Sequence, residues 1–145
     1  MTTIESFTGE YRFLSNFYSA PVLYEDIIYP TVEHAYQAAK TDNLADRRII
    51  STMAVGNAKR YGQRITLRPD WDIIKVGIME ELLKKKFEHG YLEELLLGTG
   101  NATLIEGNSW HDNFWGACNC SRCADKKKLN TLGKLLMNLR LKIPA

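Results

Sequence analysis

The chain has 145 residues, 45% of them hydrophobic and 25% charged, a length and balance that suit one compact domain with a sizeable core. The formal net charge of +2 is too small to indicate a nucleic-acid-binding face by itself. No apolar run approaches the ~20 residues of a membrane span, and the N-terminus lacks a secretory pattern. The three cysteines fall in one short window, which suits a reducing compartment, so we expect a cytoplasmic protein.

The first thirty residues have an extended pattern. Residues 4–7 and 22–29 are rich in β-branched and aromatic side chains, as in short strands. Glu25 and Asp26 predict a turn that folds the second segment into a hairpin. The proline that follows disfavours helix at the residue before it, and Thr31 is suited to cap a helix that begins immediately afterwards.

The rest of the chain is predicted to be mostly helical. The clearest helix starts near Pro69, because apolar side chains recur at spacings of 3, 4 and 4 from Trp71 to Leu82. Residues 103–106 predict a short strand, and leucines after Asn130 mark a last amphipathic helix. The sequence therefore predicts a predominantly helical α+β single domain over residues 1–145, with a few short N-terminal and mid-chain strands. Helices are expected over residues 32–40, 45–53, 54–62, 69–88 and 91–97 and around residues 132–139.

The helix after Thr31 carries polar side chains at helical spacing. Glu33, Gln37 and Lys40 lie three to four residues apart and therefore project from one face. Glu33 lies in the first turn, where the helix dipole favours a carboxylate, so it is suited to act as a base or to bind sugar hydroxyls. The more common interpretation of such a pattern is plainer: Glu33 is an N-terminal helix acid and Lys40 its solvated complement.

A second polar stretch covers residues 106–116. Loops between rigid elements concentrate binding groups, and tryptophans beside carboxylates can stack a planar ring while the acids contact hydroxyls or water. The alternative is that Trp110 and Trp115 anchor a long loop to the core. The segment FLSNFY at residues 13–18 is a further candidate. Outside the polar helix, the candidate site residues are Phe13, Ser15, Asn16, Glu106, Asp112 and Trp115. Trp71, at the head of the helix after Pro69, is more typical of a core residue than of a ligand contact.

The cysteines raise the question of a metal. Cys118, Cys120 and Cys123 supply three thiolates, but a closed tetrahedral zinc site needs a fourth ligand, for which His111 is the nearest candidate in the sequence. Without a second CxxC pair, the sequence favours no metal, and the cysteines are then a surface loop or small buried hydrophobes. A small zinc-stabilised nucleic-acid binder built around this segment is the least favoured of the functions considered.

Seven strings together span nearly the whole chain: FLSNFY (13–18), YPTVEHAYQAAK (29–40), RPDW (68–71), KF (86–87), LIE (104–106), DNFWG (112–116) and NTLGKLLMNLR (130–140). In order and spacing they resemble those of the NADAR or YbiA-like family. This resemblance implies an α-rich, cofactor-free fold that hydrolyses N-glycosidic bonds. Members cleave ribosylated pyrimidine intermediates of riboflavin biosynthesis, and others remove ADP-ribose from guanine in nucleic acid.

The resemblance also implies roles for particular residues. The functional glutamate falls on Glu33 and the site aspartate on Asp112, with tryptophans at Trp71 and Trp115. The remaining candidates are then expected to contact the substrate, a small ribosylated base or ADP-ribosylated nucleic acid. One departure is the link at residues 117–129, which is longer than in the family and leaves the choice of substrate open. The competing hypothesis is a non-catalytic module that binds ADP-ribose or a nucleotide.

Overall fold

The computed structural model describes residues 2–144 and is predominantly helical with short strands, as the sequence predicts. The chain divides into two compact units, Asn16–His89 and a second made of Met1–Ser15 with Gly90–Ala145. The single domain over residues 1–145 stays a prediction. No helix within residues 2–144 is long and apolar enough to cross a membrane.

The Asn16–His89 unit begins with the predicted hairpin. Strands β2 (Val22–Tyr24) and β3 (Ile27–Tyr29) pair antiparallel, with Val22 opposite Tyr29. The turn residues Glu25 and Asp26 have φ values of 44° and 72°, as a tight hairpin turn requires. The predicted turn is therefore confirmed.

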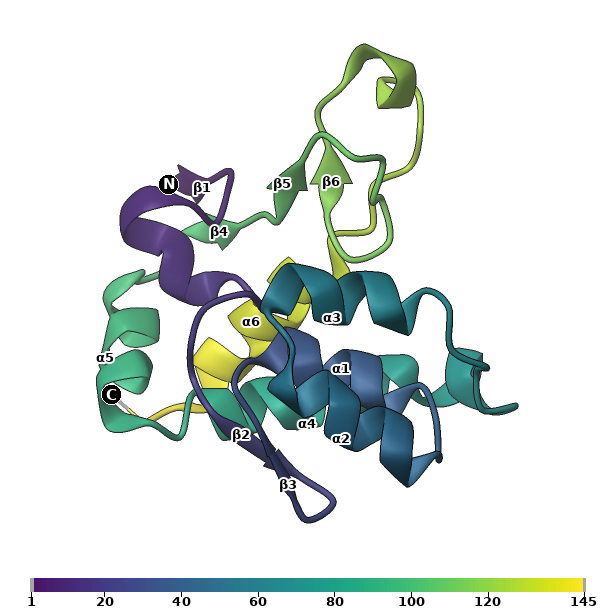
Figure 1. The fold of residues 1–145 in the computed structure, drawn as a ribbon. Coiled ribbons are helices and arrows are strands. Elements are labelled where there is room, and N and C mark those ends of the chain that lie inside the picture. The colour runs from purple at the N-terminus through teal and green to yellow at the C-terminus, as the bar shows by residue number, and fades with distance from the viewer. Residues whose placement is uncertain (1, 145) are drawn as a thin grey trace. The chain divides into compact units, whose positions relative to one another are not determined.

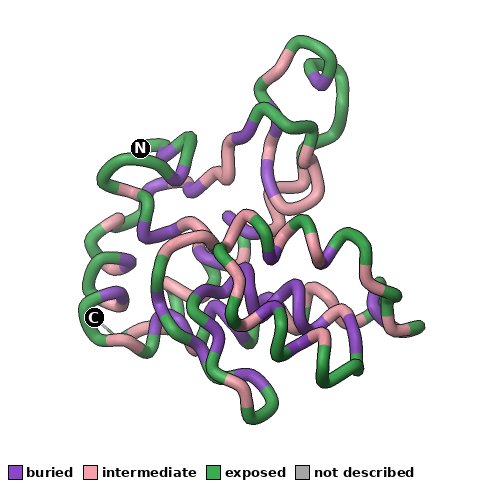
Figure 2. The backbone as a smooth tube through the Cα atoms, in the orientation of Figure 1, coloured by how far each residue is buried: buried purple, intermediate pink, exposed green. Residues whose placement is uncertain are grey.

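Four helices complete this unit, and helix α1 is packed against each of the other three (Figure 1). All eight residues of α1 are buried, including its polar ones (Figure 2). A helix with no solvated face buries its polar side chains, which costs free energy wherever they lack hydrogen-bond partners. The four helices are α1 (Val32–Ala39), α2 (Leu44–Thr52), α3 (Val55–Gly62) and α4 (Trp71–Lys86).

Helix α1 starts where the sequence predicts. The Thr31 hydroxyl accepts a hydrogen bond from the His34 backbone N–H (3.1 Å), which is a helix N-cap. The His34 ring lies between the same hydroxyl at Nδ1 (2.7 Å) and the Met53 carbonyl oxygen at Nε2 (2.7 Å). Because a carbonyl only accepts, Nε2 carries the proton and Nδ1 accepts from the threonine hydroxyl. His34 thus joins α1 to the end of α2 and has no free ring nitrogen for chemistry.

The other unit contains parallel strand pairs and two α-helices. Strand β1 (Thr3–Ile4) pairs with β4 (Thr103–Leu104), and β5 (Gly107–Asn108) pairs with β6 (Ala117–Cys118). The remaining elements are the 3-10 helices η1 (Gly9–Leu14) and η2 (Ser121–Cys123) and the helices α5 (Gly90–Gly98) and α6 (Thr131–Lys142). Helix η1 packs against α5, and α6 packs against β4 (Figure 1).

Several local expectations are wrong. Residues 9–14 form the 3-10 helix η1 instead of extended chain, and Pro69 lies before α4 instead of in its first turn. Strands β5 and β6 were not expected, because each spans two residues and is specified by its partner. Lys86, of a residue type that is seldom fully buried, is fully buried beside the rings of Tyr18 and Phe87. Its long apolar stem suits such a position better than its charge alone suggests.

Candidate active site

Glu33 is a buried carboxylate in the first turn of α1. Glu33 is only 8% exposed, and its backbone N–H donates to the Asn16 carbonyl oxygen (3.1 Å). Gln37, one turn later, donates from Nε2 to the Glu33 Oε2 atom (2.5 Å). The carboxylate therefore lies at the positive end of the helix and accepts a hydrogen bond from the next turn. The structure therefore brings together three predicted site residues, Glu33, Gln37 and Asn16.

This group, which we call the α1 cluster (Asn16, Glu33, Gln37 and Lys40), is rich in acceptors. The Asn16 Oδ1 and Gln37 Oε1 atoms are buried and have no hydrogen-bond partner among the described residues. The Asn16 Nδ2 atom has only the Met79 sulfur at 3.5 Å, a weak acceptor. Buried polar atoms without partners cost free energy, and native proteins tolerate them mainly at functional positions. A ligand with several hydroxyl groups would supply the missing donors.

Lys40 follows at the C-terminal end of α1. Burial lowers its pKa from the ordinary value of 10.5, and the charge of Glu33 acts in the opposite direction. Its Nζ atom lies 5.5 Å from the centre of the Tyr36 ring, and that ring packs against Trp71 with a centroid separation of 5.2 Å. The interpretation of Glu33 and Lys40 as an ordinary solvated pair of helix charges is therefore wrong, since Glu33 is buried and Lys40 is half-buried.

The aromatic residue at the head of α4 is part of the core. Trp71 is 5% exposed, and its ring contacts Tyr36 from α1 at an interplanar angle of 57°. Such a tilted pair is a normal core contact. Trp71 lies in the same unit as the α1 cluster and contacts α1 through Tyr36. Its predicted role against a substrate base stays a prediction.

Two predicted contact residues lie in the other unit. Phe13 is buried within η1, and Ser15 ends that helix with its backbone N–H bonded to the Arg12 carbonyl oxygen (2.9 Å). A buried phenylalanine in a short helix that packs against α5 is sufficiently explained by the core. Their assignment to a substrate site therefore still rests on the sequence resemblance.

Asp112 lies in a loop between β5 and β6 that its own hydrogen bonds hold together. Its Oδ1 atom accepts from the backbone N–H groups of Phe114 (3.1 Å) and Trp115 (2.9 Å). Asn108 is the buried centre of the loop: its Oδ1 accepts from the N–H groups of Trp110 and Asp112, both at 3.2 Å, and its Nδ2 donates to the Asp112 carbonyl oxygen (2.8 Å). The Asp112 side chain therefore stabilises the loop, in addition to the catalytic role predicted for it.

The other predicted loop residues differ in exposure. Trp115 is half-buried, with its ring edge-on to Phe114 at 4.9 Å, and Glu106 is half-buried beside β5. Trp110 is 57% exposed, so the suggestion that it anchors the loop to the core is wrong for this residue. Asn130 occupies the N-cap position of α6 without a side-chain cap bond. Its side chain accepts from the Glu106 N–H (3.0 Å) and donates to the Leu104 carbonyl oxygen (2.9 Å).

The three cysteines and His111 form a compact group in this unit. All three thiols are free, and Cys118 and Cys123 are buried. Burial opposes ionisation of Cys118, but hydrogen bonds with Cys120, His111 and Cys123 outweigh it and lower its pKa from 9.0 to about 6. For Cys123, a hydrogen bond with Asn113 acts to lower the pKa, but burial and the neighbouring sulfurs outweigh it and raise the pKa. The first thiolate to form thus suppresses ionisation of its neighbour.

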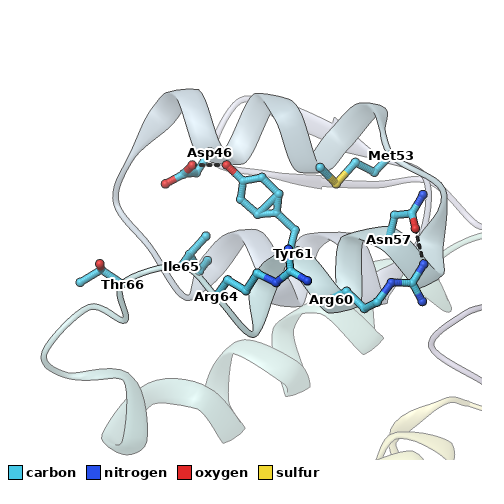
Figure 3. A pocket seen from close by; sticks show the side chains of 8 residues that line it. All are labelled: Asp46, Met53, Asn57, Arg60, Tyr61, Arg64, Ile65 and Thr66. Carbon is cyan, nitrogen blue, oxygen red and sulfur yellow. Dashed lines mark hydrogen bonds between the residues drawn. The ribbon is translucent and has the colours of Figure 1, made fainter.

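A pocket of about 550 Å³ lies elsewhere in the Asn16–His89 unit (Figure 3). Its polar side chains are largely engaged with one another, since Tyr61 donates to Asp46 (2.5 Å) and Arg60 donates to Asn57. None of the predicted site residues lines it, and we do not assign the candidate site to it. The lining residues are Asp46, Met53, Asn57, Arg60, Tyr61, Arg64, Ile65 and Thr66.

Three supporting residues were given no role of their own from the sequence, although Asn108 lies in the polar stretch 106–116 and Tyr36 in the polar helix. Asn108 organises the Asp112 loop, Tyr36 lies between Lys40 and Trp71, and Gly62 allows close approach of the Gln37 side chain. A Cβ atom at Gly62 would overlap Gln37. The repeated asparagines of the loop were a possible signal for Asn108, because asparagine side chains commonly bond nearby backbone groups. The role of Gly62 depends on helix packing and left no local signal.

Comparison with known protein families gives a direct result. The model of the NADAR domain matches residues 5–144. The chain belongs to the NADAR domain family. It is 41% identical over 140 residues to an N-glycosidase of Nostoc punctiforme, covering 92% of this chain and 86% of that protein. The predicted resemblance is therefore confirmed.

Two further relatives of this NADAR protein extend the comparison. The solved NMR structure of Escherichia coli YbiA, which is named an N-glycosidase, matches with a TM-score of 0.82 and 34% identity over 97% of this chain and 84% of that one. A maize chloroplastic riboflavin biosynthesis protein is 34% identical over 129 residues, which are 79% of this chain and 20% of that protein. The predicted class, hydrolases that act on N-glycosyl bonds, is confirmed at the level of the family.

Proposed function

We propose that this NADAR protein is an N-glycosidase that hydrolyses the C1–N bond between a ribose and a nitrogenous base. The observation that carries the proposal is the α1 cluster. Its buried Glu33 carboxylate accepts from Gln37, and the Asn16 Oδ1 and Gln37 Oε1 atoms have no hydrogen-bond partner among the described residues. Ribose hydroxyls are donors that match such acceptors. The names of its relatives in Nostoc punctiforme and Escherichia coli support the reaction type.

The chemistry sets the tasks of the site. In the hydrolysis the C1–N bond breaks, a C1–O bond forms to a water oxygen, and a proton ends on the leaving nitrogen. The reaction passes through an oxocarbenium-like state, so positive charge on the sugar must be stabilised. A buried carboxylate interacts more strongly with such charge than a solvated one, because water screens it less. We propose that Glu33 binds ribose hydroxyls and stabilises the cation or activates the water.

Asp112 has the complementary proposed role of orienting the water or protonating the leaving nitrogen. Its Oδ1 atom is already used by two backbone N–H groups, so the other carboxylate oxygen is the one proposed to act. The pairing of Glu33 with Asp112 rests on the family resemblance. Trp115 is proposed to stack the leaving base, a contact of the kind that contributes about 1–3 kcal/mol. Trp71, Phe13, Ser15 and Glu106 remain proposed substrate contacts on the same ground.

Lys40 suits a phosphate on the substrate. It is half-buried, and an anion near its ammonium group would offset the desolvation that lowers its pKa. We propose two substrate classes that carry phosphate: the ribosylamino-pyrimidine phosphates of riboflavin biosynthesis and ADP-ribosylated guanine in nucleic acid. The maize relative's name supports the first class. Three free cysteines suit the reducing cytoplasm as the place of this reaction.

The test offers both substrate classes to the purified protein and follows the products by mass spectrometry. Release of free base and the corresponding ribosyl product from one class, and from it alone, identifies the substrate. Calorimetric binding of ADP-ribose or a ribosylated pyrimidine without any release of base would contradict the proposed hydrolysis and would favour a binding module. Loss of turnover in Glu33→Gln, which preserves the shape of the side chain, is expected if the α1 cluster does the chemistry.

A further inference from the structure

His111 and the three cysteines converge on one point in the unit that contains β5 and β6. The Nδ1 atom of His111 lies 3.4 Å from the Cys123 sulfur, 3.8 Å from the Cys118 sulfur and 3.3 Å from the Cys120 sulfur. All four potential ligand atoms lie within 4.8 Å of one another. The group combines residues from the Asp112 loop, strand β6 and helix η2.

The distances from His111 Nδ1 to the three cysteine sulfurs match those of a tetrahedral metal site. With zinc–sulfur bonds of ~2.3 Å and a zinc–nitrogen bond of ~2.0–2.1 Å, a regular tetrahedron places the nitrogen about 3.6 Å from each sulfur. The three observed nitrogen–sulfur distances, 3.4, 3.8 and 3.3 Å, lie on both sides of this value. Three thiolates with one imidazole is an established ligand set for structural zinc. We propose that Cys118, Cys120, Cys123 and the Nδ1 atom of His111 bind one structural zinc ion.

Hydrogen bonding alone does not account for this arrangement. A single Nδ1 atom has either one proton or one lone pair, so it cannot bond fully to three sulfurs at once. His111 also has a φ of 69°, in the left-handed region, which a non-glycine residue adopts at a cost of about 1–2 kcal/mol. A bound cation would interact with all four ligand atoms together and would stabilise the backbone that presents the imidazole.

The ligand set indicates a structural ion. Four protein ligands close the coordination shell of zinc, whereas catalytic sites keep a position for water or substrate. The ion would tie residue 111 to residues 118–123 and so constrain the loop that holds Asp112. It would also explain why the link at residues 117–129 is longer here than the family resemblance leads one to expect, since this link contains all three cysteines. This inference is independent of the proposed hydrolase activity.

The direct test measures metal in untagged protein purified under reducing conditions from zinc-supplemented cells. Elemental analysis is expected to find close to one zinc per chain in the wild type. The variants His111→Ala and Cys120→Ser are each expected to retain far less. The matched control is His89→Ala, because His89 lies in the other unit and its Nε2 atom bonds to the Pro21 carbonyl oxygen (2.9 Å). This control should retain zinc at the wild-type level.

A second measurement keeps the test clear if a variant folds poorly. Reduced wild-type protein, stripped of metal, is titrated with cobalt(II), and a tetrahedral cobalt–thiolate absorption is expected to rise to one equivalent and to disappear on zinc addition. Circular dichroism of each variant reports whether its helices remain. Wild-type protein that contains no zinc and shows no cobalt–thiolate absorption would overturn the proposal. Wild-type zinc content in His111→Ala would overturn the assignment of the fourth ligand.

Discussion

Helix α1 and the Asp112 loop present their candidate site residues by opposite means. The polar side chains of α1 are held by a helix that is buried on every side among α2, α3 and α4. Asp112 is held by short-range hydrogen bonds centred on Asn108, in a half-exposed segment. The geometry of Glu33 therefore depends on core packing, whereas the geometry of Asp112 depends on a few local polar partners and, as proposed, on a metal.

The largest effect is expected at Glu33. Glu33→Gln removes the charge while keeping a side chain able to bond with Gln37, and kcat/KM is expected to fall by up to roughly 10⁴-fold, the upper range for a positioned acid or base. The measurement is base release from the identified substrate, with thermal unfolding as the check on folding. The matched control is Glu80→Gln, an exposed acid on α4, which should keep wild-type turnover. Wild-type turnover in Glu33→Gln would remove Glu33 from the mechanism.

A smaller loss of activity is expected at Asp112. Asn keeps a side-chain oxygen that can accept from the Phe114 and Trp115 N–H groups. Asp112→Asn therefore removes the charge and keeps the hydrogen bonds that hold the loop. We expect kcat to fall by roughly 100-fold, the lower range for general acid–base catalysis, with zinc content unchanged. The control is Asp125→Asn, which changes an exposed acid in the link at residues 117–129. If Asp112→Asn keeps full activity while Asp112→Ala loses it, the role of Asp112 is structural.

Packing around α1 is tested at Gly62. A Cβ atom there would overlap Gln37, including its own Cβ, so Gly62→Ala is expected to lower the free energy of unfolding by about 1–3 kcal/mol. A Cβ atom at Gly77 in α4 would lie in open space. Gly77→Ala is therefore expected to raise the free energy of unfolding by about 0.5–1 kcal/mol through helix propensity. Urea unfolding measures both. Equal effects of the two substitutions would show that α1 is less tightly packed than described.

The smallest effect is a pKa shift at Lys40. Burial lowers its pKa below 10.5 and the Glu33 charge partly restores it, because a nearby negative charge stabilises the ammonium form. Glu33→Gln is therefore expected to lower the pKa of Lys40 further. Titration of isotope-labelled lysine by NMR measures the shift, and the exposed Lys84 serves as the reference. A rise in the Lys40 pKa in this variant would contradict the placement of Glu33 near Lys40.

Local chemistry made part of this structure predictable. The hairpin turn at Glu25 and Asp26 and the Thr31 cap depend on neighbouring residues only, and both are confirmed. Helix η1 and strands β5 and β6 were missed because their short spans take their conformation from the segments they pack against. Among the candidate site residues, Glu33 and Gln37 were placed on one face by helical periodicity, and the structure confirms that they contact each other.

The sequence by itself determined the helical character of the chain, its membership in the NADAR family and the polar spacing within α1. Tertiary structure alone decided that α1 is buried on every side, because the helices that cover it come from residues 44–86. The residue spacing within α1 does not show how many other helices pack against it. It also decided that His111 meets the three cysteines. Sequence spacing made His111 a candidate, but β6, η2 and the Asp112 loop set the distances on which a metal ion depends.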